Sequence, residues 1–178
     1  MPSKKTKAQQ ASNKGIVKAS KKGKQPCPYA ALAPKYAKLV NGSRPWRWTS
    51  VGKKLSKTDR KKIREIARKN KLIIIVPISA KRYPTFPSST IKADHKRLPQ
   101  NLWSATDAKQ FGWLNRDLAA RNPNYDAKTQ TFKNDPLQKK YTWHHHQDKG
   151  RMQLVEFGVH NNTSHDGGRT TWAKGKRK

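Results

Sequence analysis

The stretch that decides the fold is YTWHHHQDKGRMQLVEFGVHNNTSHDGG, residues 141–168. Its first part, residues 141–148, alternates aromatic and polar groups as an edge strand does, and a turn signal follows at residues 149–151. Residues 152–155 are then suited to a returning strand. Residues 158–168, which close with two glycines, are consistent with one or two turns of helix. The pattern predicts strand, turn, strand and helix.

Five of the six histidines fall within the 22 residues from His144 to His165. Imidazole is the commonest metal ligand and the natural acid or base near neutral pH, so this concentration indicates a site. Adjacent side chains of a strand point to opposite faces, so His144 and His145 do not normally serve one metal. If His144 is the ligand, an uncharged His145 faces the substrate and takes a proton from water. His146 is expected to pack or to face solvent.

Two further histidines, His160 and His165, are expected to complete the metal site with His144. They are separated as i and i+5, which an ideal helix splays apart. Both reach one ion only if His165 lies where the helix ends, through a glycine turn at residues 166–168. Three histidines with an open fourth position fit zinc, while nickel, cobalt, manganese and magnesium stay open. A cation held here would act as a Lewis acid on a phosphodiester while His145 supplies the base.

The charge of the chain predicts the class of partner. The 178 residues contain 41 Lys plus Arg and 10 Asp plus Glu, a net charge of +31, and the first acidic residue is Asp59. Dense phosphates release counterions when such a surface approaches, so nucleic acid is the leading partner. An anionic membrane surface or an acidic protein also fits the charge. The single cysteine, Cys27, excludes an intramolecular disulfide and a cysteine-based zinc finger.

The chain divides into a tail and one domain. The lysine-rich residues 1–27 are expected to be disordered, and residues 28–178 are expected to form one α+β domain. The longest apolar run, residues 72–76, is far shorter than the roughly 18 to 20 residues of a membrane span. The predicted parts before residue 141 are a capped helix from Ser56 to Asn70, a short buried strand at 72–76, an irregular basic loop at 88–101, a helix at 105–120 and a surface connection at 122–138.

Residues 143–148 and 150–155, followed by His160 and residues 165–168, resemble the WHH toxin domain of the HNH and endonuclease VII superfamily. The resemblance extends less distinctively over residues 56–172. It implies a ββα-metal nuclease core at about 139–170, preceded by helices and a short strand, with relatives among the colicin DNases.

Carried onto this chain, the resemblance makes His144, His160 and His165 the ligands of a divalent cation and His145 the general base. Gln153 takes roughly the place of an asparagine that orients the base in other HNH enzymes, and we expect it to orient His145. The resemblance also implies the C-terminal module of a bacterial polymorphic toxin, delivered without a classical signal peptide into the cytoplasm of a target cell. Its expected partners are DNA and a small acidic immunity protein, and the expected state is a monomer.

The leading hypothesis is therefore a metal-dependent endonuclease that hydrolyses DNA. Three alternatives remain at this point: an RNase of the same fold, a non-catalytic basic nucleic-acid-binding protein with a structural metal, and a stand-alone HNH enzyme of a mobile element or phage. Charge alone favours the non-catalytic protein. The pair of adjacent histidines favours an enzyme, because a structural metal needs only one ligand from that strand.

Overall fold

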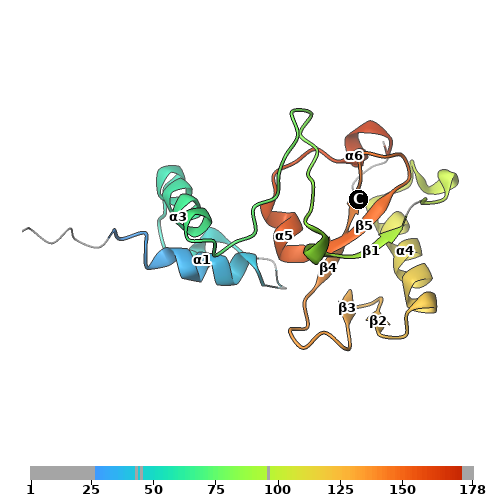
Figure 1. Ribbon diagram of the computed structural model, residues 1–178, viewed down its shortest axis with the longest axis horizontal. Helices are drawn as coiled ribbons and strands as arrows, with labels where there is room; N and C mark the ends of the chain where they lie inside the picture. The colour runs from blue at the N-terminus through green and yellow to red at the C-terminus, as the bar shows by residue number, and fades with distance from the viewer. Residues whose placement is uncertain (1–26, 43, 45, 96, 174–178) are drawn as a thin grey trace, which may run out of the picture.

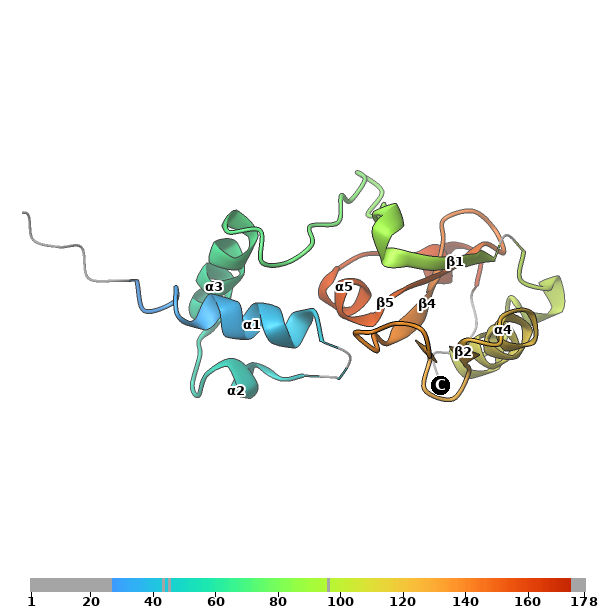
Figure 2. The same ribbon diagram turned by 60° about the horizontal axis from the view of Figure 1, so that its bottom comes forward.

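The computed structural model describes residues 27–42, 44, 46–95 and 97–173, which form the predicted α+β fold (Figure 1). The predicted tail lies outside the described residues, apart from the exposed Cys27. A group of helices forms one end of the molecule and a lobe built on an antiparallel sheet forms the other (Figures 1 and 2). Among the described helices, none combines the length and the apolar character of a membrane span. The helices are α1 (Leu32–Val40), α2 (Trp48–Val51), α3 (Lys57–Lys69), α4 (Asp107–Arg121), α5 (Phe157–Asn162) and α6 (Gly168–Thr171); the strands are β1 (Ile91–His95), β2 (Tyr125–Asp126), β3 (Thr131–Phe132), β4 (Tyr141–His145) and β5 (Met152–Glu156).

The helix α3 begins as its sequence predicts. The Ser56 hydroxyl accepts a hydrogen bond from the Asp59 amide, and the Asp59 carboxylate accepts one from the Ser56 amide. This reciprocal cap satisfies two amide groups that have no partner within the helix. Ile63 and Ala67 then meet α1 in a shared apolar core. The predicted helix is confirmed.

The predicted strand at residues 72–76 is wrong. Ile73 is buried in the core of the helical group, whereas Val76 is buried in a separate cluster beneath the sheet. Between them Ile74 is 41% and Ile75 60% exposed, so the apolar run links two cores instead of pairing in one sheet. The strand that joins β4 and β5 in the three-stranded sheet is β1, which lies within residues expected to be an irregular loop.

The sheet has the order β1–β5–β4 with antiparallel neighbours, so β4 is an edge strand. The β4–β5 hairpin confirms the predicted strand, turn and strand. The strand β1 pairs with β5 through Ala93, Asp94 and His95, after a register shift that follows Ile91. The paired residues Asp94 of β1 and Gln153 of β5 are therefore almost 60 residues apart in the sequence.

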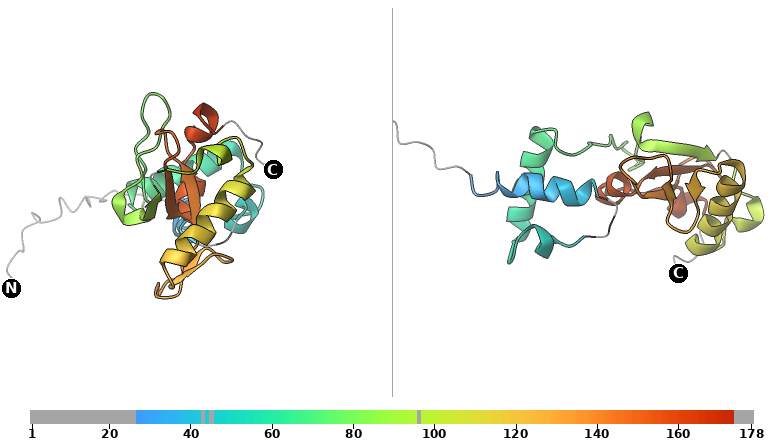
Figure 3. Two further views of the ribbon diagram at one scale, coloured as in Figure 1. Left: turned by 90° about the vertical axis from the view of Figure 1, so that its right-hand side faces the viewer. Right: turned by 90° about the horizontal axis from the view of Figure 1, so that it is seen from below.

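The two faces of the sheet are covered differently. The helix α4, predicted at 105–120 and confirmed, packs Leu114 and Leu118 into the core that contains Trp143 and Leu154 (Figure 3). On the other face, Val155 packs with α5. The connection predicted at 122–138 includes the β2–β3 hairpin, whose Tyr125 and Phe132 are buried in the same core as α4.

The helical group is attached to the lobe through α5 (Figure 3). The Tyr36 hydroxyl of α1 donates a 2.8 Å hydrogen bond to Oδ1 of Asn162. Gly158 lies so close to the end of α1 that a Cβ atom there would be 2.0 Å from the carbonyl oxygen of Val40. This close approach requires glycine, because the opposing atom belongs to the backbone and cannot swing away.

We expect Gly158→Ala to lower the free energy of unfolding by about 1–3 kcal/mol or more, because the added methyl group forces α1 and α5 apart. Urea denaturation followed by circular dichroism measures the change. The matched control is Gly112→Ala in α4, where the added Cβ would meet only the Arg116 guanidinium at 3.6 Å. Removing a mid-helix glycine should raise stability by roughly 0.5–1 kcal/mol. Equal changes in the two variants would contradict the close contact.

Candidate metal centre and adjoining histidine

The predicted ligands His144, His160 and His165 come together at one end of the β4–β5–α5 unit. One nitrogen from each ring lies within 4.8 Å of the corresponding nitrogens of the other two. The ring centroid of His144 is 5.4 Å from that of His160 and 4.9 Å from that of His165. His144 belongs to β4 and His160 to α5, whereas His165 lies in the loop between α5 and α6.

The expected route by which His165 joins the cluster needs correction. The helix α5 ends at Asn162, three residues before His165, and Gly167 precedes α6 instead of ending α5 in a glycine turn. The loop releases His165 from helical spacing, so the i and i+5 separation is no obstacle. Nδ1 of His165 lies 2.7 Å from the carbonyl oxygen of Thr163. Because that oxygen only accepts, Nδ1 carries the proton and Nε2 is left with the lone pair for a metal.

Burial keeps the His144 and His160 rings uncharged. The pKa of His144 is lowered to about 2, first by burial and then by the nearby imidazoles of His160 and His165. The pKa of His160 is lowered to about 3 by burial and by His165. Both rings are therefore neutral at physiological pH, which is the form that binds a metal.

Phe86 supports all three ligands, although the motif gave no sign of this role. Its ring centroid is 5.0 Å from that of His144, 5.8 Å from that of His160 and 5.9 Å from that of His165. The side chain is only 5% exposed, so it forms an apolar floor that limits how far the imidazoles can turn.

His145 lies on the opposite face of β4, as the alternation of a strand predicts. Its Nε2 is 2.6 Å from Oε1 of Gln110 in α4. The amide nitrogen of Gln110 donates to the carbonyl oxygens of Leu102 and Trp103, at 2.8 and 2.9 Å, which fixes the orientation of the amide. Oε1 can only accept, so His145 presents a proton at Nε2. In a neutral ring the lone pair is then at Nδ1.

The sequence reasoning missed Gln110. The residue is fully buried, and it lies four residues before Leu114 and eight before Leu118 on the apolar side of α4. A glutamine at helical spacing among leucines is the signal that could have found it, because a buried amide needs partners.

Two other residues of this region are not among the clustered ligands. Gln153 pairs with His144 across the β4–β5 hairpin and shares its face, whereas His145 lies on the opposite face; the Gln153 amide nitrogen donates to Asp94 at 3.3 Å. His146 accepts a hydrogen bond from the amide of Asp148 through Nδ1. The structure thus brings together His144, His160 and His165 as a ligand cluster that includes neither Gln153 nor His146.

His144 and His145 open on one cleft although they lie on opposite faces. The cleft has a volume of about 390 Å³ and is also lined by Asp107 and Arg169. Those two form an ion pair with a 3.0 Å distance between Nε and Oδ1, and the same Oδ1 is 3.9 Å from Nε2 of His145. Both histidines reach the cleft because β4 is the edge strand, with no neighbouring strand on its outer side.

A β-hairpin followed by a helix, with histidines gathered at one end of the unit, is the architecture of a ββα-metal nuclease. Residues 131–175 match the family described as a nuclease of the HNH/ENDO VII superfamily with conserved WHH, and the chain reads Trp-His-His at 143–145. This segment is a WHH nuclease domain of that superfamily. No curated protein and no solved structure matches the chain.

The donor set fits the divalent cation that such a nuclease uses. Three imidazoles with converging ligand atoms suit zinc or nickel, and a hydrogen bond to Thr163 already fixes the tautomer of His165. His144, His160 and His165 would therefore hold the ion.

We expect His160→Ala to weaken Zn²⁺ binding by about 100-fold or more, since an outer partner of a ligand alone is worth roughly 10- to 100-fold. Competition with a chromophoric chelator measures the affinity, and circular dichroism checks the fold. His146→Ala is the control, because His146 is close in sequence but lies outside the cluster. A similar loss of Zn²⁺ affinity in both variants would contradict this assignment of ligands.

Proposed function

We propose that the protein is a metal-dependent endonuclease that hydrolyses phosphodiester bonds of DNA. The observation that carries the proposal is the cleft that His144 and His145 share. His144 is a member of the metal cluster, whereas His145 is oriented separately by Gln110 of α4. A structural metal site would need no second histidine held in a defined tautomer. The alternative of a non-catalytic basic protein leaves this arrangement without a purpose.

The residues of the chain divide the work of hydrolysis. With its proton held at Nε2 by Gln110, His145 takes a proton from the attacking water at Nδ1. His144, His160 and His165 would hold a divalent cation, which would supply charge stabilisation at the phosphate and at the leaving oxygen. Arg169, on the wall of the cleft, adds positive charge near the phosphate while its ion pair with Asp107 fixes its position.

The net charge of +31 supports a polyanionic substrate and gives rapid, salt-dependent encounter. Water-mediated attack does not require a 2′-hydroxyl group and does not forbid one, so RNA is the second candidate substrate. Incubation with duplex DNA, single strands and tRNA separates the two.

The biological setting that we propose is that of a toxin. The resemblance to toxin nucleases supports a module, residues 28–178, that is delivered into the cytoplasm of a target cell and acts as a monomer. The same charge supports an acidic immunity protein as its inhibitor. Co-expression with each small acidic protein encoded nearby tests this, and failure of all of them to restore growth would count against it.

Plasmid nicking with an added divalent cation is the direct test of the enzyme. We expect His145→Ala to lose about 100- to 10,000-fold of the nicking rate, the usual contribution of a general base, while Zn²⁺ affinity changes little. The control is wild-type protein with excess chelator, which should also be inactive. Equal nicking by wild type and His145→Ala would overturn the assignment of the base.

Gln110→Met should reduce the nicking rate by about 10- to 100-fold, because the imidazole loses the acceptor that fixes its tautomer. We expect the effect in kcat, with KM and Zn²⁺ affinity close to wild type. Gln153→Met is the matched control, since its amide contacts Asp94 and not His145. A larger loss in Gln153→Met than in Gln110→Met would return the orienting role to Gln153.

A further inference from the structure

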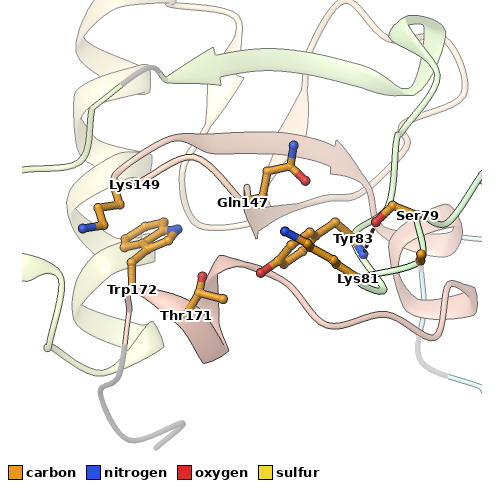
Figure 4. Close-up of a pocket in the computed structure, with 8 residues that line it drawn as sticks. Ser79, Lys81, Tyr83, Gln147, Lys149, Thr171 and Trp172 are labelled. Atoms are coloured by element: carbon orange, nitrogen blue, oxygen red, sulfur yellow. Dashed lines mark hydrogen bonds between the residues drawn. The ribbon is translucent and has the colours of Figure 1, made fainter.

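A second depression, of about 490 Å³, is lined by residues of the 79–83 loop, the β4–β5 turn and the end of α6 (Figure 4). Lys81 and Tyr83 approach it from the loop that precedes Pro84, Lys149 from the β4–β5 turn, and Trp172 from the residue after α6. Figure 4 shows the two lysines on opposite sides of the space, with Tyr83 next to Lys81 and Trp172 next to Lys149.

The depression is electropositive. None of the described residues that line it has a carboxylate, and both lysines are exposed at its rim. The nearest acidic groups along the chain are already engaged: Asp148 with Arg151, and Asp166 with Arg82 at 2.7 Å. Two lysines that line one space suit an anion with a phosphate.

The walls of the depression are bonded to the neighbours of the catalytic histidines. The Asp166 amide, next to His165, donates to the carbonyl oxygen of Arg82, in the same loop as Lys81 and Tyr83. On the other side, the indole nitrogen of Trp172 donates a 2.8 Å hydrogen bond to the carbonyl oxygen of His146, next to His145. These hydrogen bonds place two walls of the depression next to the residues of the histidine site.

The size of the depression selects what enters. Pockets of about 300 to 1,000 Å³ hold small molecules, and one nucleotide is of that class whereas a double helix is not. A base enters only if it is unpaired or has been extruded from the stack. The half-buried Tyr83 offers an aromatic ring for such a base, and stacking of this kind tolerates any sequence.

We infer that this depression binds one unpaired nucleotide next to the scissile phosphodiester, with the base against Tyr83 and phosphate oxygens at Lys81 and Lys149. The inference rests on the proposed nuclease function and adds a preference for single-stranded or locally unpaired substrate. It also gives the 79–83 loop, which lies outside the matched family segment, a part in substrate selection.

Binding without turnover tests the site. The full chain with His145→Ala, in excess chelator, is titrated into a fluorescently labelled oligo-dT strand and into a labelled hairpin duplex. Lys81→Ala/Lys149→Ala should bind the single strand about 5- to 100-fold more weakly. Its slope of log affinity against log salt should fall by about 1.4, since each lost phosphate contact on a single strand removes about 0.7.

The matched control is Lys128→Ala/Lys133→Ala, which removes the same charge from exposed lysines at the β2–β3 hairpin. We expect its single-strand affinity and its salt slope to stay near those of the parent. Equal losses in the two double variants would overturn the site, because charge alone would then explain binding. A loss on the duplex as large as that on the strand would overturn the preference for an unpaired nucleotide.

The stacking contact has its own pair of variants. Tyr83→Phe should keep single-strand affinity, and Tyr83→Leu should lower it, because only the aromatic ring stacks on a base. Equal affinities of the two variants would refute the stacking. Binding is measured with cleavage disabled, so failure of the wild-type protein to cut any nucleic acid would refute the nuclease and leave this result standing on its own.

Discussion

The site depends on the alternation of side chains along β4 at the edge of the sheet. Consecutive residues of a strand face opposite sides, so His144 and His145 are committed to different partners. In a central strand one of the two would be covered by a neighbouring layer. At the edge both reach the same cleft, so the metal ligand and the base that we propose can act on one phosphodiester from adjacent positions in the chain.

The edge of β4 is also where the chain returns to close the site. A Cβ atom at Gly168 would lie 2.0 Å from the carbonyl oxygen of His146, and one at Gly167 would lie 2.9 Å from that of His145. Only glycine lets the backbone approach so closely, and this approach brings His165 to the cluster. The glycine pair that closes the motif therefore serves the metal centre through backbone contact, not through a helix C-terminus.

Local signals in the sequence were enough for some elements and not for others. The helix α3 is specified by its own capping residues, and the β4–β5 hairpin by a turn between two short strands, so both could be predicted. The strand β1 reads Ile-Lys-Ala-Asp-His, with little apolar content, and becomes a strand only because β5 offers it a partner. The spacing of Gln110 among leucines indicates a buried amide, but its partner cannot be read from the sequence, since the contact exists only where α4 meets His145.

The matched family segment contains the histidines of the proposed site, and the rest of the chain fixes their geometry. His144, His145, His160 and His165 all lie within residues 131–175, but their supports do not. Phe86 holds the three ligands, Gln110 sets the tautomer of His145, and Tyr36 with Val40 fixes the position of α5. A catalytic constellation requires positions held to a fraction of an ångström, which a hairpin and a short helix cannot secure alone. The upstream helices and loops are therefore physically part of the catalytic unit that we propose, although the motif that indicates the chemistry lies entirely downstream of them.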